Sequence, residues 1–383
     1  MTGVADTDVK IDGEGGASGV LASQHLRALI GAGVVSADRE IDENQIQPAS
    51  IDLRLGDEAY RVRASFLPGP RATVRDKLDK LQMHRIDLRG GAVLEKGCVY
   101  IVPLQERVRL PETLSGMANP KSSTGRLDIF TRLIADRAVE FESVTPGYTG
   151  PLYAEISPRT FSVLVQPGTR LNQLRLRQGS AQMTDGQMRE LQARLPLVDS
   201  DLADIKEGVG FSVDLTPPEI GSNGMGLVGF RAKKHTGLID VDNVAGYDVE
   251  DFWEPLYLPA TPNDGLVLNP DEFYILRSKE SVTVPLDHAA EMRAYDTRVG
   301  EFRVHYAGFF DPGFGHPDVG AVGTRAVLEV RSHEVPFLLE DGQIVGRLVY
   351  EPLVEKPDKI YGAAGLGSNY QRQGLKLSKH FRG

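Results

Sequence analysis

The chain has 383 residues, 41% of them hydrophobic and 25% charged, which is an ordinary composition for a globular protein. The formal net charge of -10 argues against a general grip on nucleic acid polymers, which depends on basic surfaces, but it leaves room for a local basic pocket for a small anion. The single cysteine, Cys98, excludes a disulfide within the chain and any metal site that needs two thiolates.

The start of the chain, residues 1–17, is acidic and glycine-rich and lacks the apolar core of a signal peptide. We expect this segment to be disordered. No apolar run in the sequence approaches the roughly 18 residues that a membrane span requires. We therefore expect a cytoplasmic protein with no membrane partner.

Two segments of the sequence have helical spacing. Ser23 is placed to cap a helix that carries Leu26, Leu29 and Ile30 on one face. The second segment, residues 186–207, is polar and is broken at Pro196, so we expect a connector there.

Short strands dominate the rest of the chain. Glycine and proline together make up 64 of 383 residues, and apolar, β-prone runs such as residues 99–102 and 161–165 lie between them. Many short strands separated by turn residues are typical of an all-β sandwich or barrel.

An internal repeat divides these strands into two sets. Leu94-Glu-Lys-Gly-Cys-Val-Tyr-Ile-Val102 is echoed further along the chain by Leu268-Asn-Pro-Asp-Glu-Phe-Tyr-Ile-Leu276, and Glu155 and Gly168 recur at the same offset as Glu329 and Gly342. Ala49-Ser-Ile-Asp-Leu has a weaker echo in Phe211-Ser-Val-Asp-Leu. Matches in order at one offset indicate a duplicated β-domain. We expect a disordered N-terminus (1–17), a first domain (18–184), a connector (185–207), a second domain (208–360) and a lid-like C-terminal tail (361–383).

The run Lys121-Ser-Ser-Thr-Gly-Arg126 combines point charge, hydroxyl donors and a bidentate guanidinium in six residues. That combination suits a polyanion. A capped turn with a solvated lysine and a surface arginine ion pair is the structural alternative, and the residues alone leave both open.

Glu155 and Glu329 are carboxylates inside apolar strand segments. A glutamate in a strand usually lies on the solvated face, but recurrence in both halves favours a partly buried acid. Asp311 sits in the turn of Ala307-Gly-Phe-Phe-Asp-Pro-Gly-Phe314, where it is structural and where spacing does not reveal a ligand. In the glycine-rich tail, Tyr370 and Gln373 suit a segment that closes over a polar ligand, although disorder is the default for such a terminus.

Together these stretches resemble the dCTP deaminase family, which shares the fold of the trimeric dUTPases. The matching pieces are Gln47-Pro-Ala-Ser-Ile-Asp-Leu-Arg-Leu-Gly56, the Ser-Ser-x-x-Arg run ending at Arg126, the Asp-Pro-Gly turn at Asp311, Leu328-Glu329 and the tail Tyr370-Gln-Arg-Gln373. The length resembles a double-domain branch of the family. The resemblance therefore implies a mainly β fold of two tandem, dUTPase-like distorted barrels with a few short helices, assembled into a homo-oligomer.

The resemblance also implies an activity. Members deaminate dCTP to dUTP and ammonia with a glutamate as general base, without zinc, and with Mg²⁺ accompanying the triphosphate. It implies catalytic roles for Glu329 or Glu155, with Ser122 and Arg126 as partners. It further implies substrate contacts from Lys121, Ser123, Gln173, Arg298, Asp311, Tyr370 and Gln373.

Each half departs from the family pattern in a different place. The first half reads Thr145-Pro-Gly147 where an acid is expected before the proline, and the second half reads Arg293-Ala-Tyr-Asp-Thr-Arg298 where serine is expected at Ala294. We therefore expect one composite site, with the phosphate run from the first half and with Asp311 and Glu329 from the second. Glu155 remains the rival base. A dUTP diphosphatase, a bifunctional enzyme and a non-catalytic nucleotide-binding scaffold are the alternative functions.

Overall fold

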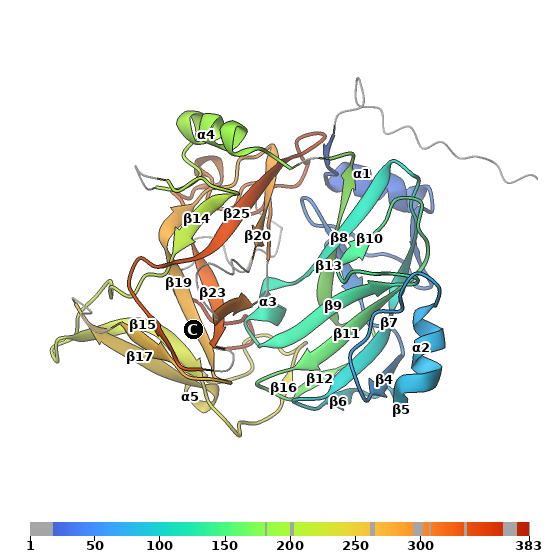
Figure 1. The fold of residues 1–383 in the computed structure, drawn as a ribbon, viewed down its shortest axis with the longest axis horizontal. Helices are drawn as coiled ribbons and strands as arrows, with labels where there is room; N and C mark the ends of the chain where they lie inside the picture. The colour runs from blue at the N-terminus through green and yellow to red at the C-terminus, as the bar shows by residue number, and fades with distance from the viewer. Residues whose placement is uncertain are drawn as a thin grey trace, which may run out of the picture.

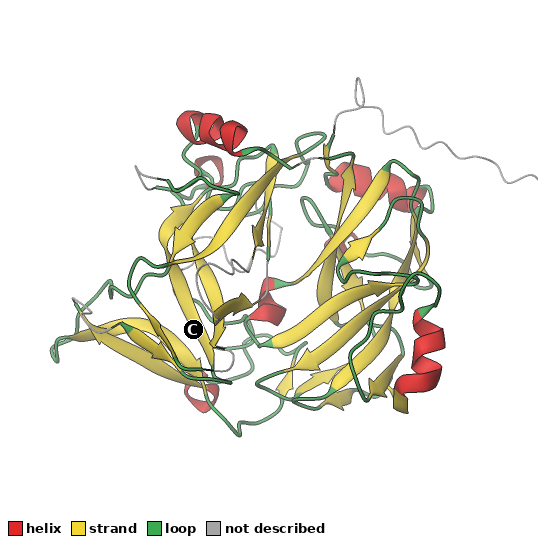
Figure 2. Ribbon diagram, in the orientation of Figure 1, coloured by secondary structure: helices red, strands yellow, loops and turns green. Residues whose placement is uncertain are grey.

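The computed structural model describes residues 18–180, 182–199, 203–260, 265–293, 302–305, 308–332, 335–362 and 374–382. Strands make up most of its regular structure, which confirms the prediction of a mainly β protein. Figure 1 shows an N-terminal half and a C-terminal half side by side. Helices lie mostly at the periphery, and one short helix sits at the junction of the halves (Figure 2).

The first half contains two larger sheets and one small sheet. One has the order β1-β13-β8-β10, with β3 also on β13: Gly19–Val20, Arg170–Gln178, Leu114–Pro120, Ser143–Val144 and Ile51–Arg54. The next has the order β5-β4-β7-β11-β9, with β2 on β7: Gln82–Asp87, Glu58–Val62, Val99–Arg109, Thr149–Pro158, Ile129–Ala135 and Val35–Ala37. The small sheet is β16-β12-β6: Ile239–Asp240, Val163–Val165 and Ala92–Leu94.

The second half has a corresponding set of sheets. One has the order β14-β25-β20-β22: Val209–Ser212, Ile344–Pro352, His288–Arg293 and Phe309–Phe310. Another has the order β17-β15-β19-β23-β21: Trp253–Pro259, Met225–Ala232, Phe273–Val282, Thr324–Ser332 and Phe302–His305. The third pairs β18 with β24: Leu266–Leu268 and Phe337–Leu339.

Corresponding strands of the two halves pair in the same register when residues are matched at the offset that separates Leu94 from Leu268. Arg175 of β13 lies opposite Met117 of β8, and at that offset Val349 of β25 lies opposite Glu291 of β20. The weaker echo is misaligned, however. Leu53 lies opposite Asn172 and Phe211 lies opposite Gly346, so the structural counterpart of Leu53 is Phe211. The similar order of residues predicts Leu215 as the counterpart of Leu53, but the pairing of each strand with its neighbour places Phe211 there.

Five α-helices lie in the described residues: α1 (Ser23–Gly31), α2 (Val74–Leu81), α3 (Ser122–Gly125), α4 (Asp185–Arg194) and α5 (Val249–Phe252). The N-cap of α1 is Ala22, not Ser23 as expected, and the Ser23 hydroxyl instead bonds to Asp358 of the second half. The helix α4 ends two residues before Pro196, as proline requires. Its Met188 and Leu191 are buried in the core of the second half, so the connector segment packs on that half.

The second half reaches back onto the first through residues 239–242. The strand β16 pairs in parallel with β12, and Asp242 accepts a hydrogen bond from Thr169 Oγ1 at 2.6 Å. Trp253 is 1% exposed and packs on Phe161 of the first half with ring centroids 5.7 Å apart. The segment of residues 239–253, called the insertion below, therefore fills space between the halves and is not an external loop.

The described end of the chain is also docked onto this insertion. Phe381 is 6% exposed and lies against Trp253 with ring centroids 5.9 Å apart, while Leu377 joins the same core. Residues 374–382 are thus held in place by apolar contacts. The predicted lid residues Tyr370 and Gln373 lie outside the described residues, as do residues 1–17.

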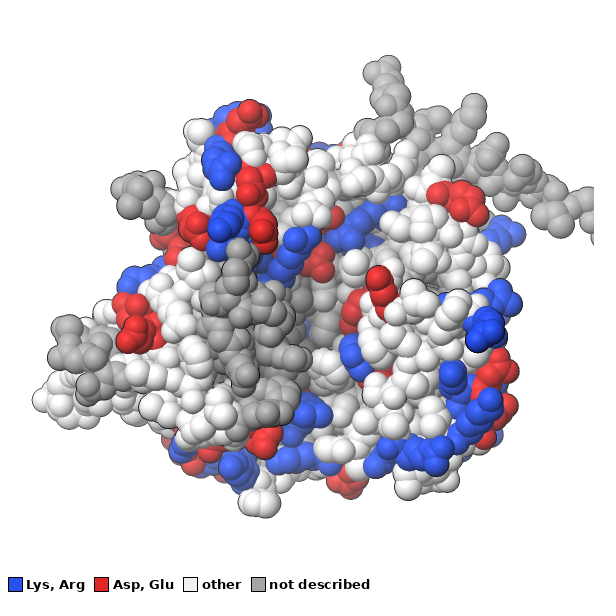
Figure 3. Space-filling model, viewed as in Figure 1, with Lys and Arg blue, Asp and Glu red and all other residues white. Residues whose placement is uncertain are grey.

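Ion pairs join the facing sheets of the two halves. Arg177 of β13 pairs with Glu291 at 2.9 Å and with Glu351 at 2.8 Å, and Arg331 of β23 pairs with Asp128. On the face in Figure 3, acidic and basic side chains are interspersed, with basic ones along the junction. The described segments contain no helix with the length and apolar character that a membrane crossing needs.

Candidate active site

A cavity of about 1040 Å³ lies at the junction of the two halves. Both halves and the end of the chain contribute to its walls. Its polar lining residues include Gln47, Asp52, Lys121, Ser122, Ser123, Arg126, Arg170 and Gln173 from the first half, Asp311 and Glu329 from the second, and Lys379 and His380 from the C-terminal segment.

Glu329 is a nearly buried carboxyl group in the wall of this cavity. It belongs to the central strand β23, which pairs with β19 and β21 on either side, so its backbone position is rigid. The residue is 5% exposed, and its Oε1 lies 3.8 Å from Nε of Arg126. Burial raises the pKa of Glu329 to about 8, against the opposing charge of Arg126. A carboxyl group in this range can both accept and return a proton near neutral pH.

Arg126 reaches Glu329 from the end of the short helix α3. The Thr124 hydroxyl donates to the Leu171 carbonyl at 3.0 Å, which fixes α3 on the neighbouring strand. Arg126 is 3% exposed and donates through Nη1 to the Lys376 carbonyl at 2.9 Å. The arginine therefore joins α3, the C-terminal segment and the cavity wall, which leaves its guanidinium little freedom to leave Glu329.

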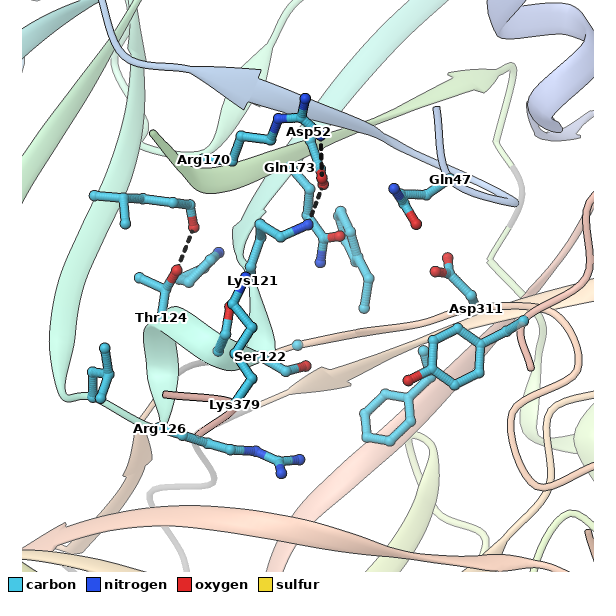
Figure 4. A pocket seen from close by; sticks show the side chains of 18 of the residues that line it. Gln47, Asp52, Lys121, Ser122, Thr124, Arg126, Arg170, Gln173, Asp311 and Lys379 are labelled. Carbon is cyan, nitrogen blue, oxygen red and sulfur yellow. Dashed lines mark hydrogen bonds and ion pairs between the residues drawn. The ribbon is translucent and has the colours of Figure 1, made fainter. Parts of the chain in front are cut away.

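Opposite charges gather at one end of the cavity around Asp52. The Lys121 ammonium lies 2.5 Å from Asp52 Oδ1, and the Arg170 guanidinium lies 3.9 Å from the other carboxylate oxygen. Figure 4 shows Lys121 directed toward Asp52, with Arg170 and Gln173 beside them. Arg170 also lies 3.6 Å from Asp42, so each cation has a carboxylate partner. The ammonium and guanidinium donors that gather at this end of the cavity suit phosphate.

The C-terminal segment places Lys379 against the same end. Ser378 donates to the Ser123 carbonyl at 2.8 Å, and His380 Nε2 lies 2.8 Å from the Val241 carbonyl oxygen, so Lys379 is fixed between two anchors. Burial lowers the pKa of Lys379, and the neighbouring charge of Lys121 lowers it further. The mutual destabilisation of these cations is relieved when an anion binds between them.

Asp311 stands at the other side of the cavity, across from Lys121 and Ser122 (Figure 4). It begins the Asp-Pro-Gly turn after β22, where Gly313 has φ 94° and where a Cβ would collide with the Ile360 side chain. Its side chain is 11% exposed, and burial raises the pKa of Asp311 to about 6 while Arg175 and Lys121 oppose this rise.

Glu155 does not reach the cavity. It lies on β11, is 2% exposed and accepts hydrogen bonds from Arg132 at 2.5 and 3.2 Å. The Arg132 guanidinium also lies 3.4 Å from the ring centroid of Phe141 and donates to Ser65 at 3.0 Å. The residue expected as the rival base is therefore enclosed in an ion pair within the first half.

The structure thus brings together most of the predicted site residues: Lys121, Ser122, Ser123, Arg126, Gln173, Asp311 and Glu329. Three others, Arg298, Tyr370 and Gln373, lie outside the described residues. Sequence reasoning missed Asp52, Arg170 and Lys379 as lining residues. For Asp52 a signal existed, since it lies in the run Gln47–Gly56, one of the stretches that carry the family resemblance.

The donor set around the cavity gives little indication of a protein-held metal. Within the described residues there is no group of three or more His, Cys, Asp or Glu side chains arranged to hold an ion. Mg²⁺ needs few protein ligands when it is bound mainly through substrate phosphates.

Two family models match the chain and together cover most of it. The N-terminal domain of 2'-deoxycytidine 5'-triphosphate deaminase matches residues 17–180, and the C-terminal domain of the same family matches residues 184–381.

Individual proteins agree with the family models. The crystal structure of 2'-deoxycytidine 5'-triphosphate deaminase from Agrobacterium tumefaciens is 56% identical, with a TM-score of 0.85 over 91% of this chain and 99% of that one. A "dCTP deaminase" of Haloarcula marismortui is 32% identical over 39% of this chain and 74% of its own length. A "dCTP deaminase, dUMP-forming" of Parafrankia sp. is 33% identical over 40% of this chain and 74% of its own length. This chain therefore belongs to the 2'-deoxycytidine 5'-triphosphate deaminase family.

Proposed function

We propose that this protein deaminates dCTP hydrolytically, giving dUTP and ammonia. The observation that carries the proposal is the pair of Glu329 and Arg126, which meet from opposite halves in the wall of a large cavity. Family membership and the Agrobacterium tumefaciens structure support the same reaction.

In the proposed mechanism Glu329 acts as the general base. Its carboxylate takes one proton from water while the water oxygen bonds to C4 of the cytosine ring. Glu329 then returns this proton to N3. It takes the second proton from the new C4 hydroxyl and passes it to the amino group, so that the C4–N bond breaks as the C4=O bond forms and the C–N bond electrons leave on ammonia. Arg126 keeps part of the Glu329 population ionised, and the Ser122 hydroxyl is the candidate for orienting the water.

The rest of the cavity matches the other parts of dCTP. We assign Lys121, Ser123 and Gln173 to the triphosphate end and Asp311 to the sugar. Charged donors fit phosphate oxygens, and a carboxylate fits a hydroxyl. The assignments of Arg298, Tyr370 and Gln373 to the substrate remain predictions.

We propose that Mg²⁺ enters as part of the nucleotide complex and that no zinc takes part. Phosphate oxygens supply most of its ligands in such complexes. When bound, the ion neutralises triphosphate charge. Asp52 and Asp242 are the carboxylates that line the cavity near Lys121 and Lys379, and they are the acidic residues that would lie near it.

We further propose that each half is a distorted barrel of the dUTPase type and that the halves arose by duplication. The repeated registers of β13 with β8 and of β25 with β20 support this view. A homo-oligomer and a cytoplasmic location remain predictions.

A second candidate function is a bifunctional reaction in which dUTP is also cleaved to dUMP. Relatives from Beutenbergia cavernae and Parafrankia sp. carry the name "dCTP deaminase, dUMP-forming", and they are 28% and 33% identical. The acid of the turn activates water in dUTPases, and Asp311 is the residue in that position here.

The test is incubation of the purified protein with dCTP and Mg²⁺, followed by ion-exchange separation of the products, with dUTP-fed and EDTA-treated samples alongside. The proposal predicts dUTP and ammonia. Formation of dUMP and pyrophosphate from dCTP would establish the bifunctional reaction, and hydrolysis of dUTP alone would indicate a diphosphatase. Tight binding without turnover of either nucleotide would overturn the proposal in favour of a non-catalytic binding scaffold.

A further inference from the structure

The strand β13 turns a row of polar side chains toward the second half. Gln173, Arg175 and Arg177 alternate along the strand and therefore share one face. Gln173 lines the cavity, while Arg177 is bonded to Glu291 and Glu351 across the junction. Arg175 lies between these two and is completely buried, although it does not line the cavity.

The contacts of Arg175 all lie around the hairpin that carries Asp311. It donates to the carbonyl oxygens of Ala290 at 3.1 Å and Phe310 at 3.5 Å. Its guanidinium lies 3.9 Å from the ring centroid of Phe309, and its Nη2 lies 3.8 Å from Asp311 Oδ1. One side chain from the first half thus holds the backbone before Asp311 and faces its carboxylate.

The charge of Arg175 requires a nearby anion, because a buried guanidinium is costly without one. Burial lowers the pKa of Arg175, and Asp311 is the carboxylate that opposes this most strongly, ahead of Glu351 and Glu291. Those two glutamates are already bonded to Arg177. Asp311 Oδ1 is buried and makes no hydrogen bond within the described residues. Asp311 is therefore the counter-ion of Arg175. Its Oδ1 is buried on the side of the arginine, while the side chain is 11% exposed and lines the cavity.

The repeat provides an independent comparison. The counterpart of Arg175 in the second half, at the offset of the repeat, is Val349, and the counterpart of Asp311 in the first-half turn is Thr145. Arg175 of the first half faces Asp311 of the second, whereas their counterparts, Val349 of the second half and Thr145 of the first, are both uncharged. The strand position therefore does not itself require an arginine, and the arginine is present where the facing turn carries an acid.

We propose that Arg175 is a positioning residue for sugar recognition, holding the Oδ1 side of the Asp311 carboxylate so that the other carboxylate oxygen accepts a hydrogen bond from the substrate's sugar. The inference rests on the proposed function. The sugar of dCTP has one free hydroxyl, the 3'-OH, because the 2' position is hydrogen and the 5' oxygen is esterified. An ionised, fixed acceptor favours a nucleotide with this hydroxyl over an analogue without it.

The test compares dCTP with 2',3'-dideoxycytidine triphosphate, which lacks the 3'-OH, in the wild-type protein and in Arg175→Gln. We expect kcat/KM for dCTP to fall by roughly 10- to 100-fold, the effect of losing a hydrogen bond to a charged group. The value for the dideoxy analogue should change little. An equal loss for both nucleotides would mean that Arg175 only supports the fold, and it would overturn the inference.

Arg177→Gln is the matched control, because Arg177 shares the strand face and the junction but faces Glu291 and Glu351. It should reduce stability and leave the preference for dCTP unchanged. Asp311→Asn should lower the same preference as Arg175→Gln, and the double variant should lose little more than either single one. Additive losses would contradict a role for Arg175 through Asp311.

A second variant covers the case in which Arg175→Gln does not fold, as judged by its thermal unfolding midpoint. Arg175→Lys keeps a positive charge beside Asp311 and should retain part of the preference for dCTP. Loss on both nucleotides alike in that variant would overturn the inference. If the wild-type protein binds dCTP without deaminating it, the proposed function fails, and the same comparison made by equilibrium binding still tests Arg175.

Discussion

Glu155 and Glu329 occupy the same position in the two halves and have different surroundings. Glu155 lies opposite Ile101, and its counterpart Glu329 lies opposite Ile275. Both are almost fully buried, at 2% and 5% exposure. An arginine of the adjacent strand bonds Glu155 directly, whereas Glu329 faces a cavity with its arginine 3.8 Å away. Strand position alone therefore does not make a catalytic carboxylate; the neighbouring groups do.

The turns of the two halves show the same division. In the turn of the second half, Asp311 faces Arg175 of the first half. The counterpart of Asp311 in the first half is Thr145, and the counterpart of Arg175 in the second half is Val349. The polyanion run at Lys121 lies in the first half. Lys121 of the first half and Asp311 and Glu329 of the second thus line one cavity at the junction.

Replacing Arg126 and Arg132, the partners of Glu329 and Glu155, should give the largest effects and separate the roles of the two glutamates. In Arg126→Met, Glu329 loses the charge that opposes its protonation, and we expect kcat to fall by about 100-fold or more. Arg132→Met strips Glu155 of its partner and should lower the free energy of unfolding by a few kcal/mol, with kcat within a few-fold of wild type. Steady-state kinetics and chemical denaturation measure both effects. Similar kinetic losses in the two variants would contradict the distinction between the glutamates.

The pH dependence of the reaction should report on Glu329. Since the base must be ionised and its pKa is about 8 in the free protein, kcat/KM should rise about tenfold per pH unit between pH 6 and 8 and then level off. Protonation of Asp311, with a pKa of about 6, should steepen the fall at lower pH. A kcat/KM that is flat from pH 6 to 8 would exclude Glu329 as the base with this pKa.

The same pKa also affects stability. The folded-state value of about 8 exceeds the ordinary 4.5, so the stabilising contribution is complete below pH 4.5 and is lost as the pH rises through 8. Glu329→Gln should remove this loss. Its unfolding free energy relative to wild type should therefore be higher at pH 9 than at pH 5.

Exchanging the turn residues gives a smaller expected effect. Asp311→Asn should lower kcat/KM for dCTP by roughly 10- to 100-fold, because the carboxylate acceptor is lost. Thr145→Asp places an acid in the other turn and should not alter the rate, because Glu155 is bonded to Arg132 and does not line the described cavity. A gain of activity in Thr145→Asp would show that the first half also retains a site.

Replacing Lys379 should have the smallest effect of these substitutions. Lys379→Met should weaken dCTP binding by about tenfold and leave dCMP binding nearly unchanged, because dCMP lacks the outer phosphates. Equilibrium binding of the two nucleotides measures the difference. Equal weakening of both would place Lys379 away from the outer phosphates.

Much of the site followed from the sequence because its residues lie in short motifs. Lys121, Ser122, Asp311 and Glu329 are recognisable from their immediate neighbours, and the complementary losses in the halves led to the composite arrangement. The mainly β fold followed from short apolar runs between glycines and prolines.

Arg175 and Lys379 could not be found in the same way. The partners of Arg175, at Ala290 and Asp311, are distant from it in the chain, and the facing of two sheets brings them together. Lys379 reaches the cavity because Phe381 and Leu377 bury themselves beside Trp253, a docking that a glycine-rich tail does not suggest. These positions depend on packing between distant parts of the chain, which local sequence patterns do not predict.

The most direct test of the composite site is turnover of dCTP by Glu329→Gln and Glu155→Gln beside the wild-type protein. The account predicts that Glu329→Gln lowers kcat by about 100- to 10,000-fold, the usual contribution of a general base, while Glu155→Gln remains within a few-fold of wild type. Full activity in Glu329→Gln together with loss of activity in Glu155→Gln would contradict the account and assign the base to the first half.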